Sequence, residues 1–250
     1  MNTEYFKKVQ PTYLEAWPRE LCALSIAQID IPLSITEAIA LGSNIIEFGE
    51  AFGKVQPIDN IIRQTQQAVQ SFPNGAFIRL GSRSPKDSWE IFKHGLKITT
   101  NDTNPLVLML GTSERTYEDL QLAIHNNYCP HIFVRQWLDI PKWSEFRCFM
   151  RNRKLIGISQ YYYDQKFDEI IDNHDTIQWA INNFFKSFKN MSHLDDIVFD
   201  IVVLLQANKN NRVWEIKLLE TNPLFEMTDP CLFDWRNNWS DFNGEFRYNQ

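Results

Sequence analysis

Two neighbouring stretches near the C-terminal end give the clearest pattern of apolar and polar positions in the chain. The first covers residues 196–205 and the second residues 212–222, and both are rich in β-branched and aromatic side chains. A polar sequence, Asn208-Lys209-Asn210-Asn211, separates them. Two such runs joined by a short polar turn predict a β-hairpin.

Similar patterns along the rest of the chain predict further strands and the helices between them. Strands are predicted over residues 76–80, 106–110 and 131–137, and a second hairpin over 146–150 and 154–160 with its turn at 151–153. Apolar residues recur at helical spacing over 58–70, 116–125 and 175–189, which predicts amphipathic helices. The chain shows no internal repeat and no long linker.

Two carboxylates fall at matching places on the predicted C-terminal hairpin. If the hairpin is symmetric about Asn210, Asp200 lies opposite Glu220, and Asn222 points the same way as Glu220. Like charges opposite each other in so apolar a setting destabilise a sheet, and a hard cation would relieve the conflict. Because Mg²⁺ prefers oxygen ligands together with phosphate and water, the spacing points to a magnesium-bound nucleoside triphosphate. The alternative is a shifted register, with both acids at solvated strand ends.

Three arginines lie inside apolar strand-like runs, where a cation needs an anionic partner. They are Arg79, Arg135 and Arg147, and each guanidinium could bind a phosphate with two hydrogen bonds. Arg83 and Lys86 follow the first of them closely. For each arginine alone, a structural ion pair within the fold is the more frequent arrangement.

Composition narrows the classes of protein. A chain of 250 residues with 44% hydrophobic residues can bury a large core, which excludes disorder, a disulfide mini-scaffold and collagen. The formal net charge is −6, so the chain lacks the excess of basic residues expected of a protein dedicated to binding duplex nucleic acid. With only 9 glycines and no glycine-rich phosphate motif, side chains and metal would have to hold any phosphates.

The cellular compartment of the protein can be inferred from its cysteines and from the absence of long apolar runs. The four cysteines are widely scattered and show no metal-ligand spacing, which predicts reduced and mostly buried thiols. No run approaches the length of a membrane span, and the first residues lack the apolar stretch of a signal peptide. We therefore expect a soluble, intracellular protein without a membrane partner.

Several stretches resemble, in the same order, the cell division cycle protein 123 family, an outlying branch of the ATP-grasp fold. They are Arg79-Leu80-Gly81-Ser82-Arg83-Ser84-Pro85-Lys86-Asp87, Val134-Arg135-Gln136-Trp137 with Glu145-Phe146-Arg147-Cys148-Phe149, Leu155-Ile156-Gly157-Ile158-Ser159-Gln160, and Val198-Phe199-Asp200 with Glu220-Thr221-Asn222-Pro223-Leu224. These motifs fall within residues 76–236.

The resemblance implies an α+β ATP-grasp fold of two lobes with mainly antiparallel sheets and the nucleotide between them. We place the lobes at residues 1–130 and 131–250, the second with the Mg²⁺ and ATP site. The resemblance puts Asp200, Glu220 and Asn222 on Mg²⁺. It directs Arg147 toward the triphosphate, as the one candidate catalytic residue.

The resemblance also assigns cofactor-binding roles nearer the N-terminus. Arg79 stands where the family usually has a phosphate-contacting lysine. The backbone around Phe133, Val134 and Arg135 resembles the hinge that reads the adenine edge. A second phosphate-binding lysine of the family is missing from this sequence, and Arg83 or Lys86 could substitute for it.

Two functions follow from the resemblance. The family is known as an assembly chaperone for eukaryotic translation initiation factor 2 that binds its gamma subunit, which implies a cytoplasmic and monomeric protein. The alternative is an ATP-grasp ligase, either a carboxylate-amine ligase or an RNA ligase or repair enzyme with RNA as a partner. Whether the chain is an enzyme stays open, although it has no K-x-D-G motif of covalent-lysine ligases.

Overall fold

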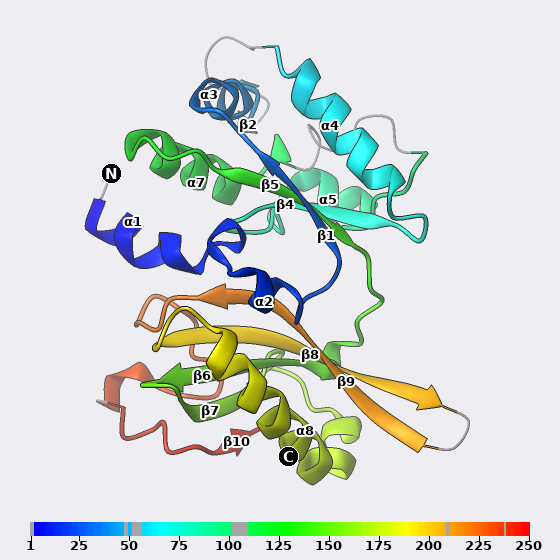
Figure 1. The fold of residues 1–250 in the computed structure, drawn as a ribbon, viewed down its shortest axis with the longest axis vertical. Coiled ribbons are helices and arrows are strands. Elements are labelled where there is room, and N and C mark those ends of the chain that lie inside the picture. Colours follow the sequence, from blue (N-terminus) through cyan, green and yellow to red (C-terminus); the bar gives the residue numbers. More distant parts are fainter. Residues whose placement is uncertain (1–2, 48–49, 52–56, 102–109, 209–210, 238) are drawn as a thin grey trace. The chain divides into compact units, whose positions relative to one another are not determined.

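The computed structural model of the chain describes all residues except 1–2, 48–49, 52–56, 102–109, 209–210 and 238 (Figure 1). It divides into two compact units, one of residues 1–10 with 27–138 and one of residues 11–26 with 139–250. Our expected boundary between 130 and 131 differs from this division. Strand β5 (His131–Gln136) pairs with strands on both of its sides in the first unit, so the chain leaves that unit only after residue 138.

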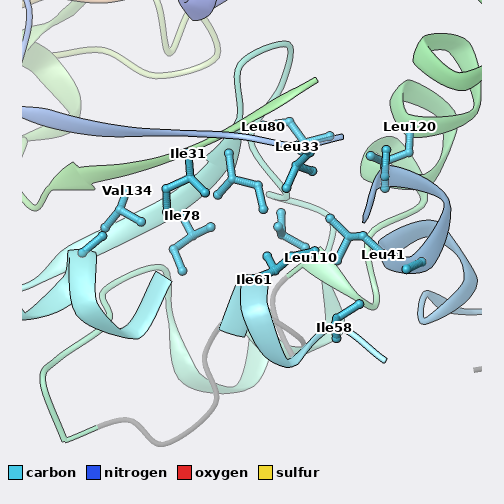
Figure 2. Close-up of a cluster of buried hydrophobic side chains, with 14 of the residues drawn as sticks. Ile31, Leu33, Leu41, Ile58, Ile61, Ile78, Leu80, Leu110, Leu120 and Val134 are labelled. Atoms are coloured by element: carbon cyan, nitrogen blue, oxygen red, sulfur yellow. The ribbon is translucent and has the colours of Figure 1, made fainter. Parts of the chain in front are cut away.

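The first unit is built on a three-stranded antiparallel sheet in the order β1 (Gln28–Pro32), β5, β4 (Ala76–Leu80). Because side chains alternate along a strand, Ile31, Ile78 and Val134 share one face of this sheet and enter the hydrophobic core (Figure 2). The helices of this unit are α1 (Thr3–Val9), α3 (Ile35–Ser43), α4 (Asp59–Gln70), α5 (Trp89–His94) and α7 (Glu114–His125), and its short strands are β2 (Ile46–Glu47) and β3 (Glu50–Ala51).

Local sequence explains where the helices of the first unit begin. Ser34 accepts a hydrogen bond from the backbone N–H of Glu37, and the Glu37 carboxylate accepts one from the N–H of Ser34, which forms a capping box for α3. Ser113 caps α7 in the same way through the N–H of Thr116. Helices α3, α4 and α7 then bury apolar residues against the core, on the side that the spacing predicts for α4 and α7.

The second unit is built on a five-stranded sheet. Its order is β10 (Phe246–Arg247), β7 (Lys154–Gln160), β6 (Glu145–Arg151), β8 (Ile197–Asn208) and β9 (Asn211–Asn222), and only the β10–β7 pair is parallel. Helix α8 (Asp168–Met191) covers one face, where the Phe188 ring stacks on Phe199 with 4.0 Å between centroids. The other face carries Phe149 and Val198, which pack against Phe233 and Phe242 of the C-terminal segment. The remaining elements of this unit are η1 (Gln10–Thr12), whose first residue belongs to the other unit, η2 (Leu14–Ala16), α2 (Arg19–Cys22), η3 (Lys142–Ser144) and η4 (Trp235–Asn237).

The predicted α+β class with mainly antiparallel sheets is confirmed. The turn of the 146–160 hairpin consists of Asn152 and Arg153, both with positive φ (48° and 58°), as a tight two-residue hairpin turn requires. The helix expected over 175–189 is longer in the structure and begins at Asp168, where two acidic residues stabilise its N-terminal turn. The strand expected over 106–110 lies outside the described residues, apart from the buried Leu110. None of the described helices is long and apolar enough to cross a membrane.

Candidate functional site

The β8–β9 hairpin brings Asp200 opposite Glu220, as its sequence predicts, but with a different pairing register from the predicted one. From the turn up to Ile201 and Leu218 the pairing is symmetric about the bond between residues 209 and 210, which alone would place Asp200 opposite Leu219. A β-bulge, a one-residue shift between Asp200 and Ile201, makes Leu219 the extra residue and restores the carboxylate pair. The predicted pair is therefore confirmed, and the symmetry about Asn210 that suggested it is wrong.

A segment near the N-terminus of the chain holds the bulge from outside. The N–H of Leu218 donates to the carbonyl of Leu24 at 2.9 Å, and the Ser25 hydroxyl donates to the carbonyl of Leu218 at 2.6 Å. Beyond the bulge, the Trp17 indole N–H donates to the Thr221 hydroxyl at 2.8 Å. Strand β9, at the edge of the sheet, is thus tied down on both sides of Glu220.

Strand pairing continues the carboxylate pair into a row of polar residues across the whole sheet. Arg247, Ser159, Arg147, Asp200 and Glu220 lie opposite one another on five successive strands, from β10 to β9. Residues paired in this way share one face of a sheet. We call these five residues the polar row.

Arg147 and Asp200 form the centre of the polar row. Nε and Nη2 of the guanidinium donate to the two oxygens of the Asp200 carboxylate, each at 2.8 Å. The third nitrogen, Nη1, donates to the carbonyl of Asp229 at 2.8 Å, and the guanidinium lies over the Tyr161 ring, 5.0 Å from its centroid. With Arg147 only 6% and Asp200 only 2% exposed, this is a buried two-bond ion pair.

One arginine does not neutralise the two acids of the polar row. Burial raises the pKa of Asp200 to about 6, Arg147 acts to lower that pKa, and the neighbouring Glu220 raises it again. The pKa of Tyr161 is also raised, first by burial and then by the charges of Asp200 and Glu220. With both acids ionised, the cluster of Arg147, Asp200 and Glu220 keeps a net negative charge that a cation would offset.

Asn222 completes the predicted set of metal ligands. It lies two residues beyond Glu220 on β9, so both side chains share the face of the polar row. Its Nδ2 is buried and has no hydrogen-bond partner among the described residues. The oxygens of Asp200, Glu220 and Asn222 form a donor set that fits Mg²⁺, and the unsatisfied amide marks a place where a further polar group would fit. In the part of the chain that the structure describes, no three His, Cys, Asp or Glu side chains form a metal site by themselves.

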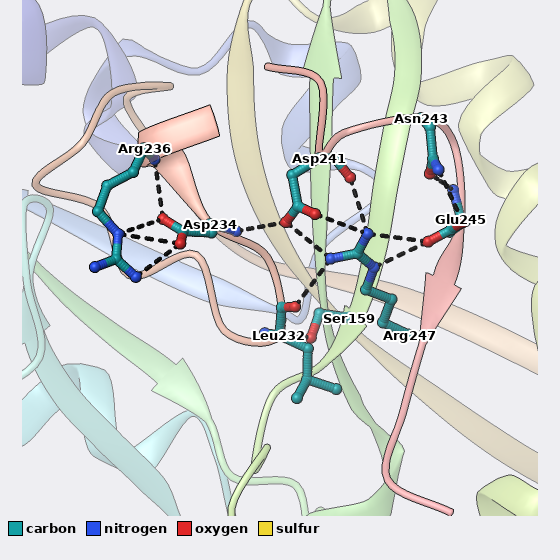
Figure 3. A network of polar contacts seen from close by, with 8 residues as sticks. All are labelled: Ser159, Leu232, Asp234, Arg236, Asp241, Asn243, Glu245 and Arg247. Atoms are coloured by element: carbon teal, nitrogen blue, oxygen red, sulfur yellow. Dashed lines mark hydrogen bonds and ion pairs between the residues drawn. The ribbon is translucent and has the colours of Figure 1, made fainter. Parts of the chain in front are cut away.

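The C-terminal segment is fastened to the other end of the polar row (Figure 3). Arg247 donates to both oxygens of Asp241, at 2.8 and 3.0 Å, and to the carbonyl of Leu232 at 3.2 Å. The N–H of Leu232 in turn donates to the Ser159 hydroxyl at 3.2 Å. Sequence reasoning missed Ser159 and Arg247, because only the strand register reveals that they continue the row that Arg147 begins.

In the first unit, the structure brings three of the predicted cofactor-binding residues to one face of the sheet. Arg79 lies opposite Phe133 on paired strands, and Arg135 lies opposite Phe77, on the face away from the hydrophobic core. The Arg79 guanidinium, 3% exposed, donates to the carbonyls of residues 80 and 82 at 3.0 and 3.3 Å. Arg135 is 1% exposed and lies over the Phe77 ring at 5.6 Å. Val134 points into the core, so only its backbone could read an adenine edge.

The two candidates for the missing lysine have different surroundings. Arg83 donates to both oxygens of Asp119 and, at 3.2 Å, to Glu118, both on α7. Although burial acts to lower the pKa of Arg83, these two acids raise it overall. Lys86 is exposed. Arg83 thus has the structural ion pair that its context allowed, and a phosphate-binding role for either residue stays a prediction.

Comparison with known proteins identifies the family. The model of the D123 family matches residues 49–245. The translation initiation factor eIF2 assembly protein of Xenopus laevis is 32% identical over 197 residues, which is 73% of this chain and 55% of that protein. The cell division cycle protein 123 of Phaeosphaeria nodorum is 28% identical over 169 residues, 63% of this chain and 42% of that protein. The chain thus spans about half the length of these curated relatives.

The fold agrees with the sequence comparison. The structure of Cdc123 from Schizosaccharomyces pombe superposes with a TM-score of 0.76 and 21% identity, over 97% of this chain and 95% of that one. Because the family model covers most of the sequence and the Xenopus laevis protein is 32% identical over 73% of the chain, the chain belongs to the D123 family, as its motifs predict.

Proposed function

We propose that this protein binds ATP with Mg²⁺ at the Glu220 end of the polar row and takes part in the assembly of translation initiation factor 2. One observation carries the first half of the proposal: two carboxylates lie opposite each other on β8 and β9, with Asn222 on the same face, and a buried arginine pairs with one of them. This arrangement has an excess of negative charge and of oxygen ligands, which is what a hard divalent cation needs.

Each residue of the cluster has a distinct part in this proposal. Glu220 and Asn222 supply oxygens from the edge strand, and Asp200 supplies one from the centre of the sheet. Arg147 fixes the orientation of the Asp200 carboxylate through two hydrogen bonds, so we assign it the role of a positioning residue; its predicted contact with the triphosphate stays a prediction. Bound Mg²⁺ would carry phosphate oxygens of ATP and offset their charge.

The resemblance to the family also assigns ATP contacts to residues of the first unit, and these assignments stay predictions. Arg79 and Arg135 share one face of its sheet, and Phe133 lies on the same strand as Arg135, opposite Arg79. These are the residues that the resemblance to the family assigns to ATP. Their contacts with backbone and ring are compatible with exchange for a phosphate, because a guanidinium carries five donors.

The second half of the proposal comes from the relatives. Several proteins that match this chain are named translation initiation factor eIF2 assembly protein. We propose that this chain likewise contacts translation initiation factor 2, through its gamma subunit as the family resemblance implies, and that it does so in the cytoplasm. The names of these relatives give no support to the alternative of a ligase acting on RNA or on a carboxylate.

Isothermal titration with ATP tests the nucleotide site. We expect wild type to bind ATP in the presence of Mg²⁺ and to lose at least about tenfold in affinity when Mg²⁺ is removed, since a cation bridge contributes more than 1.4 kcal/mol. Glu220→Gln should reproduce that loss at saturating Mg²⁺. Glu215→Gln, the same change on the same strand in an ion pair with Lys217, serves as the matched control. Equal affinity of the Glu220 and Glu215 variants would contradict the metal site.

Reconstitution with purified subunits tests the assembly role separately. The chain should bind the gamma subunit of translation initiation factor 2 in a pull-down and speed its association with the alpha subunit, without release of ADP or AMP coupled to a new bond. If the chain binds Mg²⁺ and ATP but not the gamma subunit, the partner is wrong and the nucleotide site stands. Release of ADP or AMP with a new bond to RNA or to an amine would establish the ligase instead.

A further inference from the structure

Strand β1 forms an edge of the three-stranded sheet in the first unit, and no described strand bonds to the backbone groups on its outer side. The N–H of residue 136 donates to the carbonyl of Ala27, and the N–H of Leu33 donates to the carbonyl of Pro130, so odd-numbered residues of β1 bond to β5. Because bonding alternates along an antiparallel strand, Gln28, Asp30 and Pro32 direct their backbone groups outward. Among the described residues, no strand pairs with this side of β1.

A groove runs along this edge. It has a volume of about 370 Å³ and lies between residues 29–32 of β1 and one side of helix α4. Gln64 and Gln67 of α4 and its C-cap residue Ser71 are exposed and form the polar wall of the groove, and the buried Ala68 lies among them. These residues follow one another at about one helical turn and line the groove together with residues 29–32 of β1. We call this feature the edge groove.

We propose that the edge groove binds an extended peptide segment of a partner protein, which adds a strand to β1 and places a basic residue opposite Asp30. A strand between a sheet edge and a helix satisfies the open backbone groups of the edge and buries alternate side chains against the helix. This proposal goes beyond the nucleotide site and does not depend on it.

The backbone and side-chain groups along the edge of β1 determine which peptide sequence would bind there. Asp30 can exchange both backbone hydrogen bonds with the residue opposite it, whereas Pro32 has no N–H and can only accept. The peptide side chain opposite Asp30 lies on the face of Asp30, and its two neighbours point toward Ala68 and the amides of Gln64 and Gln67. Of the described residues that line the edge groove, Asp30 alone is charged. Its Oδ1 is hydrogen-bonded to Nδ1 of His131 at 2.7 Å, and because the Asp30 side chain is 47% exposed, a basic residue of the peptide can add to that contact. The best match is therefore a basic residue between two β-branched ones.

A synthetic peptide tests the edge groove directly. The probe is acetyl-Thr-Val-Lys-Val-Thr-amide, titrated into ¹⁵N-labelled full chain. We expect chemical-shift changes confined to the amides of residues 28–32 and 64–71. Methylation of the central lysine nitrogen removes its N–H and should weaken binding roughly tenfold, since it deletes one hydrogen bond and obstructs the strand pairing. The same peptide with Glu in place of Lys should bind about two- to fivefold more weakly, as like charges then face each other.

Variants of the chain separate this site from chance contacts. Gln67→Trp should fill the edge groove and abolish the shifts, whereas Gln70→Trp, on the same helix but outside the groove, should leave them unchanged. Asp30→Lys should reverse the preference between the Lys and Glu peptides. Circular dichroism would establish that each variant keeps its fold.

Three results would overturn the proposal. They are the absence of shifts at residues 28–32 at the highest soluble peptide concentration, equal binding of the N-methylated peptide, and equal binding by the Gln67 and Gln70 variants. A concentration-dependent dimer in sedimentation that excludes the peptide would show that a second copy of the chain occupies the edge instead.

Discussion

The ion pair between Arg147 and Asp200 determines which substitutions in the site can be interpreted. Asp200→Ala is an obvious test of metal binding, but it leaves the Arg147 guanidinium buried without its carboxylate. Breaking a buried pair from one side typically destabilises a protein by about 3–5 kcal/mol. Loss of ATP binding in Asp200→Ala would therefore not distinguish the loss of a metal-binding carboxylate from the loss of the fold.

We predict that Asp200→Ala lowers the free energy of unfolding in urea by several kcal/mol, and that Arg147→Met in the same chain recovers part of it. The recovery follows because the double variant has no unpaired buried charge. Glu220→Gln is the matched comparison and should have a much smaller effect, since Glu220 is only partly buried. Additive effects of the two single changes would show that the pair is not coupled.

The raised pKa of Asp200 gives the site a pH dependence. Mg²⁺ binds the carboxylate and competes with the proton, so magnesium-dependent ATP affinity should fall as the pH is lowered through about 6. Without a cation the sign is opposite. The folded pKa of about 6 lies above the usual value of 3.8, so this group favours the folded state most below pH 4 and loses that contribution as the pH rises through 6. Titration calorimetry and thermal melts between pH 5 and 8, with and without magnesium and ATP, would test both directions.

The thiols should differ in their reaction with iodoacetamide. Burial raises the pKa of Cys231 to about 12 and holds the pKa of Cys148 well above its usual range, so both carry little thiolate at pH 8. Cys129 is exposed and should be alkylated first. Mass spectrometry of the folded chain over time gives the order of reaction, and faster modification of Cys148 than of Cys129 would contradict the burial of β6.

Strand β7 depends on a glycine at its centre. A Cβ on Gly157 would lie 2.7 Å from the Phe233 ring, which itself packs against Phe149 and Phe242. We predict that Gly157→Ala destabilises the protein by about 1–3 kcal/mol, because the ring cannot move without disturbing its neighbours. Gly42→Ala is the control: its Cβ would lie at an ordinary contact distance of 3.6 Å from the Gln121 side chain, and within α3 alanine is the better helix former. Chemical denaturation of both variants measures the difference.

The elements show how far the sequence alone can predict this structure. The β8–β9 hairpin and helix α4 follow from local periodicity, and their predicted bounds are nearly right because each element has one consistently apolar side. The bulge at Leu219 has no local signature in the sequence, because contacts with Leu24 and Ser25, which are distant in the sequence, stabilise it. The pairing of Asp200 with a buried arginine could not be read from the sequence for the same reason.

The polar row also connects parts of the second unit that lie far apart in the sequence. At one end, Glu220 and Asn222 form the proposed metal site; at the other, Arg247 holds the C-terminal segment through Asp241 and Leu232. That segment in turn supplies the Asp229 carbonyl that accepts from Arg147. The position of the guanidinium that orients Asp200 thus depends on how firmly the segment is held.

We predict that Arg247→Met loosens this connection. Loss of its bonds to Asp241 and to the carbonyl of Leu232 should raise the rate of hydrogen exchange over residues 229–242. It should also weaken magnesium-dependent ATP binding, but by a smaller factor than Glu220→Gln does, because the proposed metal ligands themselves remain. Arg236→Met is the control within the same segment, since Arg236 pairs only with the nearby Asp234 at the surface, among the contacts described for it. If exchange over the segment rises while ATP affinity stays at the wild-type value, the C-terminal segment stabilises the fold without affecting the site.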